Sequence, residues 1–222
     1  MEILAEGAVI GYGQRDVVDH LDLQVSGGIT AILGPVDSGK TTVMRALATL
    51  LPPRSGRLLL DGHDVRVTAT ARRLRADIRY LPQDAGLEPA MSVRDHLHYA
   101  AWVCGITRQA TDHHVRRVLA DLGLTDHAGT RTKRLPDEER RWVSLAGALI
   151  GTPRLILLDG AFDDWNGVDH SRLRRILRGQ ASATVVVTAR ERVDVRGVAD
   201  RAISLGSLMS TATTVASAGG RG

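Results

Sequence analysis

The sequence predicts an α/β fold with a mostly parallel central sheet and a helical subdomain. Three observations predict it. A strand, a glycine-rich loop and a helix follow one another in the first quarter of the chain. Short apolar β-type runs alternate with helical segments in the last third, which is the rhythm of a parallel sheet. Between these parts lies a long stretch whose apolar residues recur at helical spacing.

The first strand, loop and helix are predicted from local patterns. Apolar and polar residues alternate over residues 21–25, which is typical of a half-buried strand. After a Ser-Gly-Gly turn, the apolar run 29–33 predicts a buried strand. Residues 41–51 carry apolar side chains at helical spacing, and the two prolines at 52–53 end that helix.

The middle of the chain contains shorter β segments and then the helical subdomain. Residues 57–62 resemble one arm and the turn of a hairpin, residues 71–77 form a basic helical patch, and residues 78–81 a short strand. Ser92 is a plausible helix N-cap. The signals from there are helical, so we expect the helical subdomain at about residues 90–135.

The last third supplies the remaining strands. Compact β-type runs occupy residues 154–159, 184–188 and 202–205, separated by helical segments. We therefore expect one domain over residues 1–206. Residues 207–222 are rich in Ser, Thr, Ala and Gly, and we expect them to form a flexible C-terminal tail.

Composition narrows the class of protein. The chain has 222 residues, of which 43% are hydrophobic, enough for one α/β core. Its 29 basic residues are spread along the chain and include only two lysines, Lys40 and Lys133, so no nucleic-acid partner is expected. The single cysteine fits a reducing cytoplasm. No apolar run approaches the ~20 residues of a membrane-spanning helix, so any transport would need another chain to cross the bilayer.

The glycine-rich loop carries the strongest motif. It fits the pattern GxxxxGK[ST] between a strand and a helix, and with the residue that follows it consists of Gly34, Pro35, Val36, Asp37, Ser38, Gly39, Lys40, Thr41 and Thr42. The glycines let backbone N–H groups curl around phosphates, and the helix N-terminus favours the anion. Lys40 would reach the β- and γ-phosphates, and Thr41 would bind Mg²⁺. The alternative is a tight turn without a ligand. Asp37 is tolerable only if its charge points to solvent.

In the order and spacing of its motifs, the chain resembles the ATP-binding subunits of bacterial ABC transporters from about residue 3 to residue 208. The resemblance implies a P-loop NTPase of the ABC ATPase type, with an antiparallel β-subdomain and a helical subdomain beside a mostly parallel core sheet. It implies ATP and Mg²⁺ as ligands. Tyr12 matches the aromatic residue on which adenine stacks, a contact of roughly 1–3 kcal/mol by analogy with base stacking elsewhere. A tyrosine between glycines is also a common turn residue.

Two further motifs complete the implied metal site. The run Tyr-Leu-Pro-Gln that ends at Gln83 resembles the family's glutamine loop, where Gln83 would contact Mg²⁺ or the attacking water. Residues 155–159 resemble the Walker B strand, whose Asp159 would hold the magnesium shell. Thr41, Gln83 and Asp159 are therefore the expected metal group. Asp159 has the alternative role of capping the end of a strand.

Three positions depart from the family pattern. Gly160 stands where the family has a glutamate that polarises water, and positioned bases contribute on the order of 10²–10⁴ in rate. Ala189 stands where the family has its switch histidine. The signature motif is replaced by residues 135–139, Leu-Pro-Asp-Glu-Glu, which make a good helix start but place three carboxylates where the family grips phosphate.

These motifs imply an ATP-binding subunit of an ABC-type transporter with impaired hydrolysis, although the family activity is that of an ATPase. The implied partners are a separate transmembrane permease subunit and a second cassette, either this chain or another ABC subunit. The implied location is cytoplasmic, on the inner face of the cell membrane. Two alternatives stay open: an active transport ATPase that uses unconventional groups such as Asp163 or Asp164, and a non-enzymatic regulatory or assembly partner that retains the fold.

Overall fold

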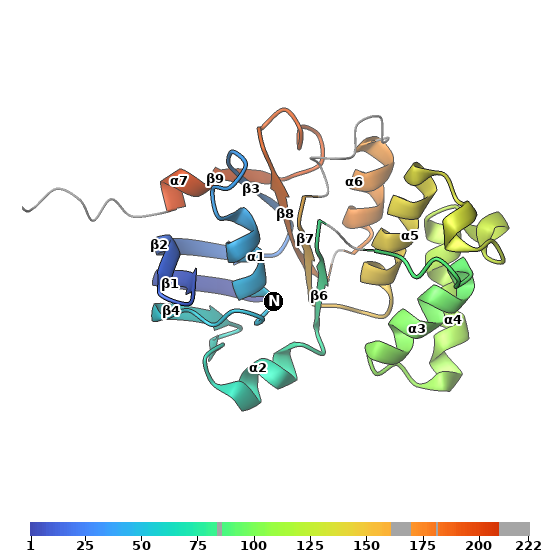
Figure 1. Ribbon diagram of the computed structural model, residues 1–222, viewed down its shortest axis with the longest axis horizontal. Helices are drawn as coiled ribbons and strands as arrows, with labels where there is room; N and C mark the ends of the chain where they lie inside the picture. The colour runs from blue at the N-terminus through green and yellow to red at the C-terminus, as the bar shows by residue number, and fades with distance from the viewer. Residues whose placement is uncertain (84–85, 161–169, 181, 209–222) are drawn as a thin grey trace, which may run out of the picture.

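Two β-sheets organise the chain, for which a computed structural model describes residues 1–83, 86–160, 170–180 and 182–208 (Figure 1). The strands are β1 (Glu2–Tyr12), β2 (Arg15–Ser26), β3 (Ile29–Leu33), β4 (Ser55–Leu60), β5 (His63–Asp64), β6 (Ile78–Leu81), β7 (Leu155–Leu158), β8 (Thr184–Ala189) and β9 (Arg201–Ser204). The α-helices are α1 (Lys40–Leu47), α2 (Thr68–Leu74), α3 (Val93–Val103), α4 (Arg108–Asp121), α5 (Asp137–Leu149), α6 (His170–Arg178) and α7 (Leu205–Leu208). Short 3₁₀ turns occupy Thr125–His127 and Thr132–Arg134.

The two sheets differ in strand direction. One sheet has the order β2-β1-β4-β5, and all its pairs are antiparallel. The other has the order β6-β7-β8-β3-β9, and all its pairs are parallel. The predicted parallel core sheet and the separate antiparallel β-subdomain are therefore both confirmed.

The parallel sheet divides the core into two apolar clusters, because alternate residues of a strand face opposite sides. On β7, Leu155 and Leu157 join the cluster on the side of the antiparallel sheet, whereas Ile156 and Leu158 join the cluster under the helices. Helix α1 lies between the two sheets (Figure 1), and its fully buried Met44 and Leu47 belong to the first cluster. Helix α1, which follows the glycine-rich loop, is thus part of the core.

The other face of the parallel sheet is covered by helices. In Figure 1, α3, α4 and α5 gather at the end of the molecule opposite the antiparallel sheet, and α6 lies beside them. Ser92 is the N-cap of helix α3, as predicted, and its Oγ accepts a hydrogen bond from the backbone N–H of Asp95. Arg172 of α6 stacks 4.2 Å from the Trp142 ring centre on α5 and donates to the carbonyl oxygen of Leu122 at the end of α4. This arginine joins three helices.

Some local predictions need correction. Helix α1 ends at Leu47 rather than at residue 51, because Thr49 takes a left-handed φ of 59° and closes the helix. Helix α2 begins at Thr68, earlier than the predicted patch, and it ends at Leu74, because the last residues of that patch form the turn before β6. Helix α7 covers residues 205–208, and its Leu208 is buried, while the domain bounds at residues 206 and 207 stay a prediction. Residues 209–222 lie outside the described part of the chain.

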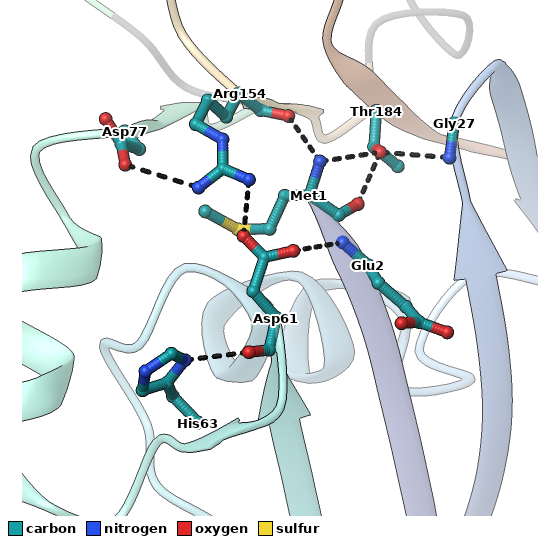
Figure 2. Close-up of polar contacts among 8 residues, drawn as sticks. All are labelled: Met1, Glu2, Gly27, Asp61, His63, Asp77, Arg154 and Thr184. Carbon is teal, nitrogen blue, oxygen red and sulfur yellow. Dashed lines mark hydrogen bonds and ion pairs between the residues drawn. The ribbon is translucent and has the colours of Figure 1, made fainter.

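A polar network ties the two sheets together (Figure 2). Arg154, just before β7, contacts Asp61 in the β4–β5 turn at 2.7 Å and Asp77, just before β6, at 3.9 Å. The hydroxyl of Thr184, at the start of β8, accepts hydrogen bonds from the N-terminal amine of Met1 and from the backbone N–H of Gly27. The start of β1 is thereby fixed to the parallel sheet.

Candidate functional site

The candidate site lies at the carboxyl ends of the parallel strands, where open α/β sheets bind their ligands. A cavity of about 510 Å³ opens there. It is lined by Tyr12, Arg15, Val17, Val36, Asp37, Ser38, Gly39, Lys40, Thr41, Thr42, Gln83, Asp159, Thr188 and Arg190. All the expected nucleotide and metal residues except Gly34 and Pro35 line this single cavity, so the structure brings together motifs that are far apart in the sequence.

The phosphate loop, residues 34–41, connects the end of β3 to α1 in a tight curl. Gly39 caps the helix with a φ of 96°, and a Cβ there would lie 2.9 Å from a methyl of Val18, so only glycine fits without strain. A Cβ at Gly34 would lie 2.6 Å from the hydroxyl of Ser38. That hydroxyl is buried and has no hydrogen-bond partner among the described residues, as expected of a group that meets a ligand.

Lys40 and Asp37 give the loop its charges. The Lys40 ammonium is buried and donates hydrogen bonds of 2.7 Å to the carbonyl oxygens of Gly34 and Pro35, which is how these two residues join the site. Asp37 is exposed at the mouth of the cavity, the placement under which its charge is tolerable. The loop therefore holds its cation inside and its anion at the solvent side.

The expected metal group has the chemistry that Mg²⁺ prefers. Thr41 offers a hydroxyl, Gln83 an amide oxygen and Asp159 a carboxylate, all lining one cavity, and hard cations take oxygen ligands. Asp159 is only 3% exposed. Its Oδ1 accepts from the Thr188 hydroxyl at 2.9 Å and its Oδ2 from the Tyr80 hydroxyl at 3.0 Å. Both of these donors are side-chain hydroxyls, whereas a strand cap would accept backbone N–H groups.

Tyr12 lies at the end of β1, next to the turn into β2, and its ring lines the cavity. The residue is 42% exposed. Arg45 of α1 donates a 3.0 Å hydrogen bond to the Tyr12 hydroxyl, and its guanidinium carbon lies 5.9 Å from the ring centre. The hydrogen bond to Tyr12 raises the pKa of Arg45. Tyr12 thus combines a position next to a turn with partial exposure at the cavity.

The two missing side chains have different surroundings. Gly160 has a left-handed φ of 64°, and a Cβ there would lie 2.7 Å from Cγ and 2.8 Å from Cδ of Gln83. Its N–H donates to the Thr188 hydroxyl at 2.7 Å. Ala189 is fully buried, and its carbonyl oxygen accepts from the N–H of Gly34 at 3.2 Å. Asp163, Asp164 and their neighbours in the sequence lie outside the described residues.

Helix α5 begins where the family signature would stand. Its first turn contains Asp137, Glu138 and Glu139, as the sequence predicts. Pro136 is the N-cap, with an extended ψ of 158°, rather than the first helical residue. Asp137 is exposed and pairs with Arg140 one turn further on. Negative charges interact favourably with the positive N-terminal end of a helix dipole, so these acidic residues stabilise the start of α5.

Five residues of the cavity region were not expected from the sequence: Arg15, Val17, Tyr80, Thr188 and Arg190. Tyr80 and Thr188 left a weak signal, because each is a hydroxyl near the carboxyl end of a strand that leads into the site. Arg15 and Arg190 are exposed and left none, since arginines occur throughout the chain. Arg190 directly follows Ala189 and brings a cation to the cavity wall beside the missing histidine.

Comparison with known proteins gives the same result at three levels. The family model described as "ABC transporter" matches residues 18–163. A probable ABC transporter ATP-binding protein of Azorhizobium caulinodans is 30% identical over 90% of this chain and 72% of its own length. The lipoprotein-releasing system ATP-binding protein LolD of Bacteroides thetaiotaomicron is 29% identical over 85% of this chain and 90% of its own length.

Solved structures agree on the fold. CbiO1 of Clostridium perfringens, part of an ABC transporter complex, superposes with a TM-score of 0.78 at 22% identity, covering 91% of this chain and 83% of its own. A putative ABC transporter ATP-binding protein of Pyrococcus furiosus has a TM-score of 0.76 at 19% identity, covering 95% of this chain and all of its own. With the matched family model and the motifs in one cavity, the conclusion is that this chain belongs to the ABC transporter family.

Proposed function

We propose that this chain is the ATP-binding subunit of an ABC transporter and binds ATP with Mg²⁺ in the 510 Å³ cavity. The observation that carries the proposal is the meeting of the phosphate loop, Tyr12, Gln83 and Asp159 in that one cavity. Adenine stacks on Tyr12, the loop amides and Lys40 hold the phosphates, and Thr41, Gln83 and Asp159 surround the metal.

We propose further that hydrolysis is slow. Nothing at Gly160 can act as a base, and the side chain of Gln83 occupies the space into which a side chain at that position would extend. The methyl group of Ala189 cannot contact a phosphate through a hydrogen bond. Loss of a positioned base alone lowers a rate by about 10²–10⁴.

The proposed assembly pairs this chain with a second cassette, itself or another ABC subunit, and with a separate permease at the inner face of the cell membrane. None of the helices that the structure describes has the length and apolar character of a membrane-spanning helix. In the proposed assembly, the permease crosses the bilayer. The acidic start of α5 weakens closure of such a dimer, because its carboxylates would face the partner's γ-phosphate. Two unit charges ~4 Å apart cost about 4 kcal/mol at an effective dielectric of 20.

The decisive experiment compares the two lysines of the chain. Binding of ATP is measured with and without Mg²⁺ by titration calorimetry, and phosphate release is measured alongside, for the wild type, Lys40→Ala and Lys133→Ala. Lys133 is exposed and does not line the cavity, so it is a matched control. We expect Lys40→Ala alone to lose ATP binding, with phosphate release near background throughout.

Two results would contradict the proposal. Absence of ATP binding by the wild type would remove nucleotide from the function and favour a regulatory or assembly role. Turnover typical of enzymes, on the order of 1 s⁻¹ or more, would show that other groups replace the missing base. In that case Asp163→Asn and Asp164→Asn are the next variants to assay.

A further inference from the structure

The carboxylate of Asp159 is held on both oxygens by hydroxyl groups. Thr188 donates to Oδ1 and Tyr80 donates to Oδ2, at 2.9 and 3.0 Å. An ionised carboxylate has about four lone-pair sites. Two of them are used by these donors, and Asp159 also lines the cavity, where the remaining lone pairs can meet a ligand. The carboxyl plane is therefore fixed by one donor from β6 and one from β8, the strands on either side of β7.

The register of the sheet explains how Tyr80 reaches Asp159. Tyr80 of β6 is paired with Leu157 of β7, and Asp159 follows Leu157 by two residues. Residues two apart on a strand project to the same face. The ring of Tyr80 packs against the apolar cluster around α1, so only its hydroxyl extends to the site.

A hydrogen bond behind one of the two hydroxyls sets its direction. The N–H of Gly160 donates to the oxygen of Thr188 at 2.7 Å, so the proton of Thr188 is left to point at Asp159.

We propose that Tyr80 is a positioning residue for Asp159, which it holds in the orientation required by the magnesium shell. The inference rests on the proposed function, since it concerns the same site. Partners that orient a metal-binding carboxylate typically contribute 10–100-fold to metal affinity. Tyr80 acts through Asp159 and does not itself contact the metal in this proposal.

The test separates metal from nucleotide. Binding of trinitrophenyl-ATP is followed by fluorescence, first in EDTA and then as MgCl₂ is added, for the wild type, Tyr80→Phe and Tyr99→Phe. Tyr99 lies on α3 with 51% exposure and controls for loss of a tyrosine hydroxyl outside the site. We expect Tyr80→Phe to raise the half-maximal Mg²⁺ concentration about tenfold. Affinity in EDTA and the melting temperature should stay close to the wild type.

A second pair of variants tests whether Tyr80 acts through Asp159. In an Asp159→Ala background, Tyr80→Phe should cause little further change in Mg²⁺ dependence, because coupled residues give non-additive effects. The inference is overturned if Tyr80→Phe shifts the Mg²⁺ midpoint less than about twofold, or if its effect is unchanged without Asp159. If the wild type binds no nucleotide at all, the proposed function fails first and this inference fails with it.

Discussion

Asp37 carries a conformation and a charge that both bear on phosphate binding. Its φ of 61° lies in the left-handed region, which asparagine, aspartate and above all glycine tolerate. Its carboxylate is exposed at the mouth of the cavity that the proposal assigns to phosphates. The backbone conformation of Asp37 and the charge of its side chain can therefore be tested separately.

Replacing Asp37 separates these two effects. Asp37→Asn removes the charge and keeps a residue that tolerates the left-handed conformation, so we expect ATP affinity to rise about fivefold at low salt. Asp37→Gly should give the same gain in affinity and, in addition, a higher melting temperature. Calorimetric titration and thermal unfolding measure the two quantities. Equal affinity of wild type and Asp37→Asn would show that the carboxylate does not act on the ligand.

Restoring the glutamate at position 160 is expected to fail. Gly160→Glu forces a non-glycine residue into φ 64° and places its Cβ against Gln83, so we expect a loss of about 1–3 kcal/mol in the free energy of unfolding and no gain in phosphate release. Gly62→Glu is the control, because Gly62 has φ 74° and a Cβ added there would meet nothing within 4 Å. A full rescue of turnover would show that Gln83 moves aside without cost.

The cavity residues show what sequence could predict at this scale. The phosphate loop, Gln83 and Asp159 are recognisable because each follows a strand in a fixed motif. Tyr80 and Thr188 leave only a weak signal, a hydroxyl near the end of a strand, because their role depends on the register that sets β6 and β8 beside β7. Whether Gly160 is a simple loss or a rearrangement was also beyond the sequence, since it depends on a φ angle and on the position of Gln83.

Among the elements, α3 and α5 meet at a close contact that contains a histidine. His96 of α3 is partly buried, and a side chain at Gly147 of α5 would lie 3.4 Å from its Nε2. Burial lowers the pKa of His96 below its ordinary value of 6.5. The neutral ring is therefore the form that the packed helices favour.

This burial predicts a dependence of stability on pH. The unfolded chain takes up the proton near pH 6.5, before the folded protein does, so the free energy of unfolding falls as pH drops from there to the lower pKa of the folded state. His96→Gln should remove this part of the dependence. Urea unfolding at a series of pH values measures it, with His63→Gln, an exposed site on β5, as the control. Identical pH profiles for wild type and His96→Gln would contradict the assignment.

At the scale of elements, regular patterns were predictable and irregular ones were not. Strand β6 has the predicted bounds, and β3 matches the apolar run. Strand β1 was not predicted. Its pairing with β2 shifts register between Ala5 and Ala8, and Gly7 between them takes a left-handed φ of 53°, so no clear alternation is left in the sequence. The close approach of Gly56 to Gly7 is equally invisible without the structure.

For the whole molecule, the junction in Figure 2 connects the antiparallel sheet to the parallel sheet. Arg154 contacts Asp61 on one side and Asp77 on the other. Its side chain is 53% exposed, so water screens both pairs. The ion pairs at this junction favour one relative orientation of the two sheets. The apolar cluster around α1 contributes most of the free energy that holds the sheets together.

Removing this arginine should therefore have a small, salt-dependent effect. We expect Arg154→Met to lower the free energy of unfolding by less than about 1 kcal/mol at low salt, and by less still at high salt. Urea unfolding at two salt concentrations measures the effect. Arg57→Met is the control, because Arg57 pairs with Glu6 within a single sheet. A larger loss that salt does not reduce would mean that the arginine stem contributes by packing.

The burial of α1 between the two sheets has a consequence for exchange of backbone amide hydrogens with solvent. Because both sheets cover the buried side of this helix, we expect the amides of its last turn, residues 44–47, to exchange mainly when the molecule unfolds globally. The same helix begins at Lys40 of the phosphate loop. A ligand at the loop makes global unfolding rarer by mass action, so slower exchange at residues 44–47, which do not line the cavity, would report its occupancy.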